Sequence, residues 1–105
     1  MKKKAMEALI SMGMPANIRG FKYIVEIIGK YEEDESWMYG KLTYMYEVIG
    51  KKECTCGRNV ERCIRKAFET VLIRGNREVV DRYLTRDNTT AGNLLAVFYL
   101  RLQDK

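Results

Sequence analysis

The stretch from Ile49 to Asn76, IGKKECTCGRNVERCIRKAFETVLIRGN, most constrains how this chain can fold. The short segment KECTCG within it interrupts two runs that have helical periodicity. Thr55 is a residue type that begins helices, and Gly75 is one that ends them. Between them, apolar residues recur at three- and four-residue steps, which predicts one buried stripe: Val60, Ile64, Ala67 and Val71. The pattern therefore predicts two helices joined by a tight turn, a helix-turn-helix.

The other side of the second predicted helix carries side chains that can recognise DNA. Arginine can hold guanine with two hydrogen bonds, asparagine can pair with adenine, and glutamate can accept from cytosine. The residues expected to read bases are Arg58, Asn59, Glu61 and Arg62. The residues expected to contact phosphates are Lys51, Lys52, Thr55, Arg65 and Lys66. A run of charges alone usually indicates a solvated helix face, but its coincidence with the helix-turn-helix pattern favours contact with double-stranded DNA.

The charge distribution agrees with this hypothesis. The chain has 19 basic and 14 acidic residues, a formal charge of +5. Six basic and two acidic residues lie between Lys51 and Lys66, so +4 of that excess falls on the predicted reader. Local neutralisation of phosphates, rather than total charge, drives binding to a polyanion. With 105 residues, 47% of them hydrophobic, and one proline, we expect residues 1–105 to form a single compact domain.

Nothing in the sequence suggests an enzyme or a cofactor. The chain contains no histidine, which removes histidine bases, histidine triads and most zinc sites. The acidic run 32–35 could supply carboxylates, but four in a row are typical of a solvated linker between helices. Because no nucleophile, base and orienting group occur together, we expect a protein without catalytic activity.

Three cysteines, Cys54, Cys56 and Cys63, lie within ten residues. Their spacing does not match the paired knuckles of structural zinc sites, so no metal site is expected. An odd number of thiols, with neither a signal peptide nor a long apolar run, indicates the cytoplasm and no membrane association. We interpret Cys63 as a small core residue and the other two as turn residues, with a redox role left open.

The rest of the chain also reads as helical. Residues 3–12 place Met6, Leu9 and Ile10 on one side of a helix that stops at Gly13. Asn17 is expected to cap the next helix, which has apolar residues at helical steps up to the acidic run. A third helix, opened by Asp34 or Ser36, is expected to align a further stripe: Met38, Leu42, Met45 and Ile49.

The C-terminal part predicts two more helices. Asn76 is expected to cap a short one, and residues 85–90, TRDNTT, read as a loop. The apolar segment 94–102 would suit a buried strand, but no partner strand occurs, so a helix is expected. The fold class is therefore all-α, a compact bundle of about six helices. Core packing is the default role for its aromatic residues, with a self-association patch as the alternative: Trp37, Tyr39, Tyr44 and Tyr46.

Three segments together resemble a known family. They are GMPANIRG at 13–20, YEVIGKK at 46–52 and NVERCIRKAFETVLIRGN at 59–76. In this order they are similar to the C-terminal DNA-binding effector domain of the stage-zero sporulation response regulator of spore-forming Firmicutes. The resemblance is collinear over most of the chain and weakens after Tyr83, where mainly the apolar pattern matches.

The resemblance implies a transcriptional regulator of six helices whose fourth helix enters the major groove. It also implies copies placed head-to-tail on repeated sites, and contact with sigma factor or RNA polymerase. Carried over by position, Glu61 and Arg62 match groove-contacting residues, and Arg65 and Lys66 match backbone-contacting ones. Lys66 stands where the family has histidine, and a phosphate contact should survive this change because lysine supplies a positive charge.

Two departures from the family pattern define an alternative. Asn59 stands where relatives have a base-contacting arginine, and Glu53 replaces an aromatic residue near the turn. We expect Glu53 to sit poorly in a core and to loosen or re-angle the turn. The alternative is an interaction module with an eroded reader, which binds sigma factor, RNA polymerase or a full-length sporulation regulator.

Overall fold

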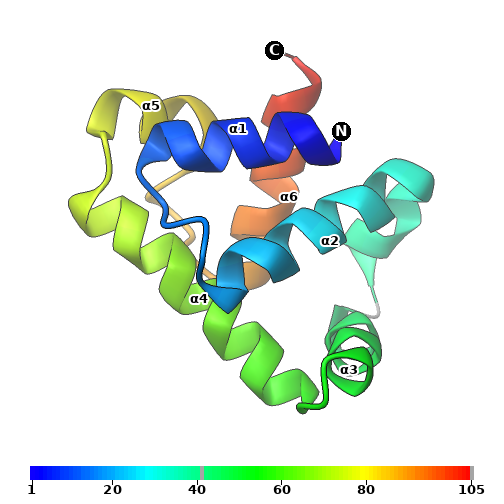
Figure 1. Cartoon of the computed structure of the whole chain (residues 1–105). Coiled ribbons are helices and arrows are strands. Elements are labelled where there is room, and N and C mark those ends of the chain that lie inside the picture. Colours follow the sequence, from blue (N-terminus) through cyan, green and yellow to red (C-terminus); the bar gives the residue numbers. More distant parts are fainter. Residues whose placement is uncertain (41, 105) are drawn as a thin grey trace.

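The protein consists of helices throughout the residues that the structure describes, 1–40 and 42–104 (Figure 1). In this computed structural model, six α-helices and one 3-10 helix, η1, follow one another in those residues. They are α1 Lys2–Met12, α2 Arg19–Glu33, η1 Glu35–Tyr39, α3 Leu42–Lys52, α4 Gly57–Arg74, α5 Arg77–Tyr83 and α6 Ala91–Gln103. The predicted all-α bundle of about six helices is thus confirmed.

Helix α2 lies at the centre of the bundle, in contact with α1, α4, η1 and α6. Isoleucines at helical spacing, Ile24, Ile27 and Ile28, are fully buried and give this helix its place in the core. Gly20 lies where α2 meets α4, and a Cβ atom at this position would lie 2.7 Å from the Cβ of Ala67. The missing side chain therefore sets how closely α2 approaches α4.

Helix α4 buries the stripe that the sequence predicts. Its four predicted residues are all in the core: Val60, Ile64, Ala67 and Val71. Phe68 joins them and packs edge-to-face against Phe98 of α6, with ring centroids 6.4 Å apart. Gly75 ends α4 as predicted, and Asn76 caps α5 by accepting a hydrogen bond from the backbone N–H of Val79. Helix α4 is therefore held along one side for its whole length.

The first helix ends as expected but faces the core differently. Gly13 has φ of 100°, the left-handed conformation that favours glycine, and its N–H bonds to the carbonyl of Ile10. Of the predicted apolar side, Leu9 is buried as expected, but Met6 and Ile10 are exposed. Helix α1 instead packs through a stripe with two small residues, which permits a close approach to α2: Ala5, Ala8, Leu9 and Met12.

Two predicted helix starts are also wrong. Ile18, rather than Asn17, precedes α2, and no side chain caps that helix. Helix α2 then continues through Glu33, so the first part of the acidic run is helical and not a linker. Asp34 caps only the short η1, since its carboxylate accepts from the N–H and hydroxyl of Ser36, which lowers the pKa of Asp34.

The predicted third helix is therefore divided in two. Gly40 is extended after η1, and α3 is described from Leu42 onward. Met45 and Ile49 are buried as expected, whereas Met38 and Leu42 are only half-buried. At the C-terminal end, residues 85–90 are irregular and α6 follows as a helix, both as predicted.

Candidate nucleic-acid interface

A tight turn at residues 53–56 joins α3 to α4. The N–H of Glu53 donates to the carbonyl of Ile49, and the N–H of Thr55 donates to that of Gly50, at 3.0 and 2.7 Å. Cys54 adopts a positive φ of 58° between them. A Cβ at Gly50 would lie 2.8 Å from the carbonyl carbon of Cys56, so glycine is needed where the turn folds back on α3. These contacts fix the direction in which α4 leaves the turn.

The N-cap of α4 is Cys56 and not the predicted Thr55. The N–H of Thr55 donates to α3, and its hydroxyl accepts from the side-chain amide of Asn59 at 3.0 Å rather than from a backbone N–H of α4. The N–H groups of Asn59 and Val60 bond instead to the carbonyl of Cys56. Thr55 is thus one residue outside α4, next to its first turn.

Two ion pairs tie the turn and the end of α3 to α2. Lys22 donates to Glu53 at 2.9 Å, and Lys52 lies 3.6 Å from Glu26. The bond to Lys22 lowers the pKa of Glu53, and the same bond raises the pKa of Lys22. Glu53, which is expected to sit poorly in a core, places its carboxylate in this ion pair instead, and the expected loosening or re-angling of the turn stays a prediction. Local sequence patterns could not reveal Lys22 and Glu26, since each pairing joins residues far apart in the chain.

A buried tyrosine lies behind this junction. Tyr46 of α3 is 7% exposed, and its hydroxyl has no hydrogen-bond partner among the described residues. Burial raises the pKa of Tyr46, so it stays protonated at neutral pH. It lines a cavity of about 550 Å³ together with residues that include Arg58 and Glu61. This cavity between α3 and the first turn of α4 therefore has the charged side chains of Arg58 and Glu61 in its wall.

Helix α4 brings most of the predicted site residues onto one outer face. Arg58, Arg62 and Lys66 are exposed, and Asn59, Glu61 and Arg65 are half-buried beside them. Lys51 and Lys52, both exposed, lie at the end of α3, and half-buried Thr55 lies in the turn. The predicted base-reading and phosphate residues thus surround the first half of α4, and none of them is buried in the core.

Several of these side chains are already paired with one another. Arg62 donates to the side-chain carbonyl of Asn59 at 3.0 Å. Arg65 lies 3.3 Å from Glu61 and 3.7 Å from Glu69, one turn of helix away on either side. Both glutamates are partly exposed, so these are surface ion pairs worth about 0.3–0.5 kcal/mol each. Arg58 and Lys66 have no side-chain partner in the described part of the chain.

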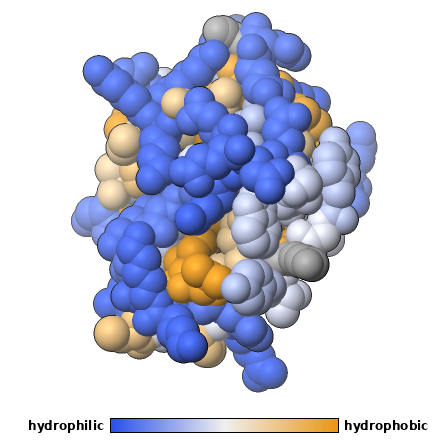
Figure 2. Space-filling model, turned by 90° about the vertical axis from the view of Figure 1, so that its right-hand side faces the viewer, coloured by the Kyte–Doolittle hydropathy of each residue, from blue (hydrophilic) through white to orange (hydrophobic). Residues whose placement is uncertain are grey.

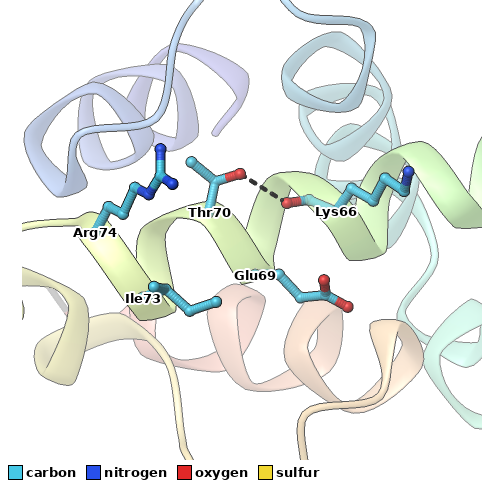
Figure 3. Close-up of a pocket in the computed structure, with 5 residues that line it drawn as sticks. All are labelled: Lys66, Glu69, Thr70, Ile73 and Arg74. Atoms are coloured by element: carbon cyan, nitrogen blue, oxygen red, sulfur yellow. Dashed lines mark hydrogen bonds between the residues drawn. The ribbon is translucent and has the colours of Figure 1, made fainter.

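The second half of α4 presents a different outer face. A shallow cavity of about 390 Å³ there is lined by Lys66, Glu69, Thr70, Ile73 and Arg74. Figure 3 shows Glu69 and Ile73 along one edge of the helix and Thr70 and Arg74 along the other. The hydroxyl of Thr70 bonds to the backbone carbonyl of Lys66, and Ile73 is 78% exposed. This region offers fewer free donors than the first half.

The side of the molecule that carries η1 and α3 has an apolar patch among hydrophilic side chains (Figure 2). A cavity of about 220 Å³ on this side is lined by Lys30, Trp37, Tyr44, Met45, Val48 and Ile49. Trp37 stacks on Tyr44 with ring centroids 6.1 Å apart. The default of core packing is right for Tyr46 but wrong for Tyr39 and Tyr44, which are exposed.

The cysteines contribute no ligand cluster. Cys54 and Cys56 are exposed in the turn, as expected for turn residues, and Cys63 packs against the core while remaining half-buried. Among the described residues no group of three or more cysteine, aspartate or glutamate side chains is placed to hold a metal ion.

Comparison with known protein families matches residues 5–98 to the family described as Sporulation initiation factor Spo0A C terminal. The chain belongs to this family. The Spo0A C-terminal family comprises DNA-binding effector domains of a sporulation response regulator, which act in transcription regulation rather than as a class of enzymes. The match extends from α1 into α6, so it includes both α3 and α4. Within the described residues, no helix is long and apolar enough to cross a membrane.

Proposed function

We propose that this chain binds double-stranded DNA in a sequence-specific manner, with α3, the turn and α4 acting as a helix-turn-helix reader. The observation that carries the proposal is the outer face of α4, where basic side chains are free in solvent while the opposite face is fully packed. A helix about 10–12 Å wide fits a major groove about 12 Å wide. The packing on α2 and α3 would hold this helix rigidly as it enters.

The site residues divide by position. Arg58 and Arg62 lie on the exposed first turns of α4, where a guanidinium can reach guanine, and Glu61 and Asn59 flank them. Lys51, Lys52 and Thr55 lie beside the start of α4, and Arg65 and Lys66 lie just over two turns further along the helix. These five residues would follow the phosphate backbones on either side of the groove.

Further parts of the proposal concern partners and context. A second copy would lie head-to-tail on a repeated site, and sigma factor or RNA polymerase would contact the bound protein. The proposal also retains the predictions of a single domain over residues 1–105 and of a cytoplasmic location. It requires no cofactor, because binding uses only side-chain and backbone groups.

Selection of duplexes from a random pool, followed by anisotropy titration, tests this function. With about four phosphates neutralised, by Lys51, Lys52, Arg65 and Lys66, the logarithm of affinity should fall with the logarithm of salt at a slope of about −3.6. Arg62→Ala should cost about 1–3 kcal/mol on the selected duplex and relax base preference. Lys66→Ala should weaken all duplexes alike and reduce the salt slope by about 1.

Two results would contradict the proposal. Equal losses on every sequence for both variants would remove the division between base and phosphate contacts. Weak, salt-labile binding without any selected sequence would favour the alternative, an interaction module with an eroded reader. Pull-down with purified RNA polymerase holoenzyme would then be the matched measurement for that alternative.

A further inference from the structure

Asn59 lies at the centre of a short chain of hydrogen bonds at the start of α4. Its side-chain Nδ2 donates to Oγ1 of Thr55, and its Oδ1 accepts from Nη2 of Arg62, both at 3.0 Å. Thr55 is itself fixed, because its backbone N–H donates to the carbonyl of Gly50 at 2.7 Å. Hydrogen bonds and the short turn therefore connect the end of α3 to the guanidinium of Arg62.

The orientation of the Asn59 amide follows from its neighbours. A guanidinium only donates hydrogen bonds, so the amide oxygen of Asn59 must face Arg62. The amide nitrogen is then directed at Thr55, whose hydroxyl oxygen can accept. The opposite orientation would bring two donors together, which makes this arrangement the favoured one.

These bonds leave Asn59 little capacity to read a base. Pairing with adenine uses both the oxygen and the nitrogen of an asparagine amide. In Asn59 each of these atoms already holds one bond, so reading adenine would have to use the second N–H and the second lone pair of a half-buried amide whose orientation Thr55 and Arg62 fix. Arg62, by contrast, has five N–H donors and uses one of them here, so it keeps enough for a bidentate contact with guanine.

We propose that Asn59 is a positioning residue, which holds Arg62 in the conformation that reads its base, rather than a base reader itself. The inference rests on the function proposed above and assigns one residue's part in it. Arg58 provides the contrast, since it occupies the same face one turn earlier without a side-chain partner in the described residues. The base preference of this chain would then depend on Thr55 and Asn59 through Arg62.

The first test measures Arg62 in the free protein. Nitrogen relaxation of the arginine Nε–H groups should show Arg62 more ordered than Arg58, and Asn59→Ala should make the two alike. Unchanged order of Arg62 in this variant would overturn the positioning role. This measurement uses no DNA, so it tests the positioning role independently of the proposed function. If the wild-type protein bound DNA without sequence preference, only the proposed function would be contradicted.

The second test uses a double-mutant cycle on the selected duplex and its single-base-pair variants. Asn59→Ala should reduce discrimination about five-fold, the value of one net hydrogen bond, at the base pair that Arg62→Ala also relaxes. The double variant should discriminate no worse than Arg62→Ala alone. If Asn59→Ala instead relaxes a different base pair and its effect adds fully, Asn59 reads a base and the inference is wrong.

Asn59→Asp and Thr55→Val complete the design. Aspartate can accept from Arg62 and from the hydroxyl of Thr55, but it cannot form the two bonds that adenine requires. Asn59→Asp should therefore retain discrimination at the Arg62 base pair while weakening all duplexes through its added charge. Thr55→Val should reduce discrimination at that same pair by less than Asn59→Ala does. Loss of all discrimination in Asn59→Asp, with an unchanged melting temperature, would overturn the proposal.

Discussion

The two halves of α4 share one helix axis and one buried stripe, yet their outer faces differ in charge. Residues 57–66 carry four basic side chains and one acidic one, whereas residues 67–74 carry one of each. In the first half, side chains hydrogen-bond along the helix from Thr55 to Arg62. In the second half, a large apolar side chain, Ile73, is exposed.

The contacts that hold the two halves of α4 in place also differ in charge. The first half rests on the turn, which ion pairs fasten to α2, and on the close approach at Gly20. The second half rests on apolar and backbone contacts: Phe68 packs on Phe98, and Arg86 donates to the carbonyl of Leu72 at 2.8 Å. Both halves are thus packed along the buried stripe, and the first half has charged supports in addition.

The contrast between the halves bears on how much of α4 could serve in the proposed DNA contact. A straight helix of 18 residues is about 27 Å long, so it cannot keep its whole length in one curved groove. Only the half with both free cations and fixed side chains is suited to bases. The second half would extend away from the duplex, where neutral and apolar residues are tolerated.

The largest effect on stability is expected at Gly20, where α2 packs closely against α4. Gly20→Val would force its side chain against the backbone carbonyl of Cys63, in the first half, and against the neighbouring Ala67, and so separate α2 from α4 at a cost of about 3 kcal/mol. Thermal unfolding should show a melting temperature lower by about 10–20 °C. Gly40→Val is the matched control, since nothing lies within 4 Å of a Cβ at Gly40. Equal stability of the two variants would mean that the α2–α4 approach is not a constraint.

The sequence predicts what depends on local pattern. The 3.6-residue period identified the buried stripe of α4, and residue type identified the ends at Gly13, Gly75 and Asn76. The predicted caps at Asn17 and Thr55 are wrong because packing decides which residue takes the extended backbone of an N-cap. Thr55 is held by Gly50 of the preceding helix, a contact that no propensity of threonine contains.

The site was predictable to a similar extent. Helical spacing was sufficient to place Arg58, Arg62 and Lys66 on one exposed face. It could not show that Lys22 would hold Glu53, because these residues are 31 positions apart and belong to different elements. Nor could it show that both ends of the Asn59 amide are occupied, since that depends on side-chain conformations after folding.

A smaller effect is expected from the acidic residue that begins the second half. Glu69 is exposed and lies 3.7 Å from Arg65, so its charge opposes phosphates near the proposed interface. Glu69→Gln should tighten binding to every duplex about two- to five-fold at low salt without changing base preference. Glu78→Gln on α5, which also removes an exposed ion pair, is the matched control. Anisotropy titrations would contradict the contrast between the halves if both variants bind alike.

The smallest effect is expected from the ion pair between Lys22 and Glu53, which ties the turn to α2. It should appear as a pH-dependent part of the free energy of unfolding. The pKa of Glu53 is lowered from its ordinary 4.5, so the pair with Lys22 stabilises the fold above that pH. This stability should disappear as the pH falls through the lowered pKa of Glu53. The pKa of Lys22 is raised above 10.5, so the stability is fully present below that value and is lost as the pH rises through the raised pKa.

Denaturant unfolding of the wild type and Glu53→Gln across this range measures the effect. The difference in the free energy of unfolding should be constant between about pH 5 and 10 and shrink on either side, because both partners are charged only in that window. Asn76→Ala, which removes an uncharged cap beyond the second half of α4, should give a difference of about 1 kcal/mol that does not change with pH. A Glu53→Gln difference that persists undiminished at pH 3 would mean that the turn, like the second half of α4, is held by packing alone.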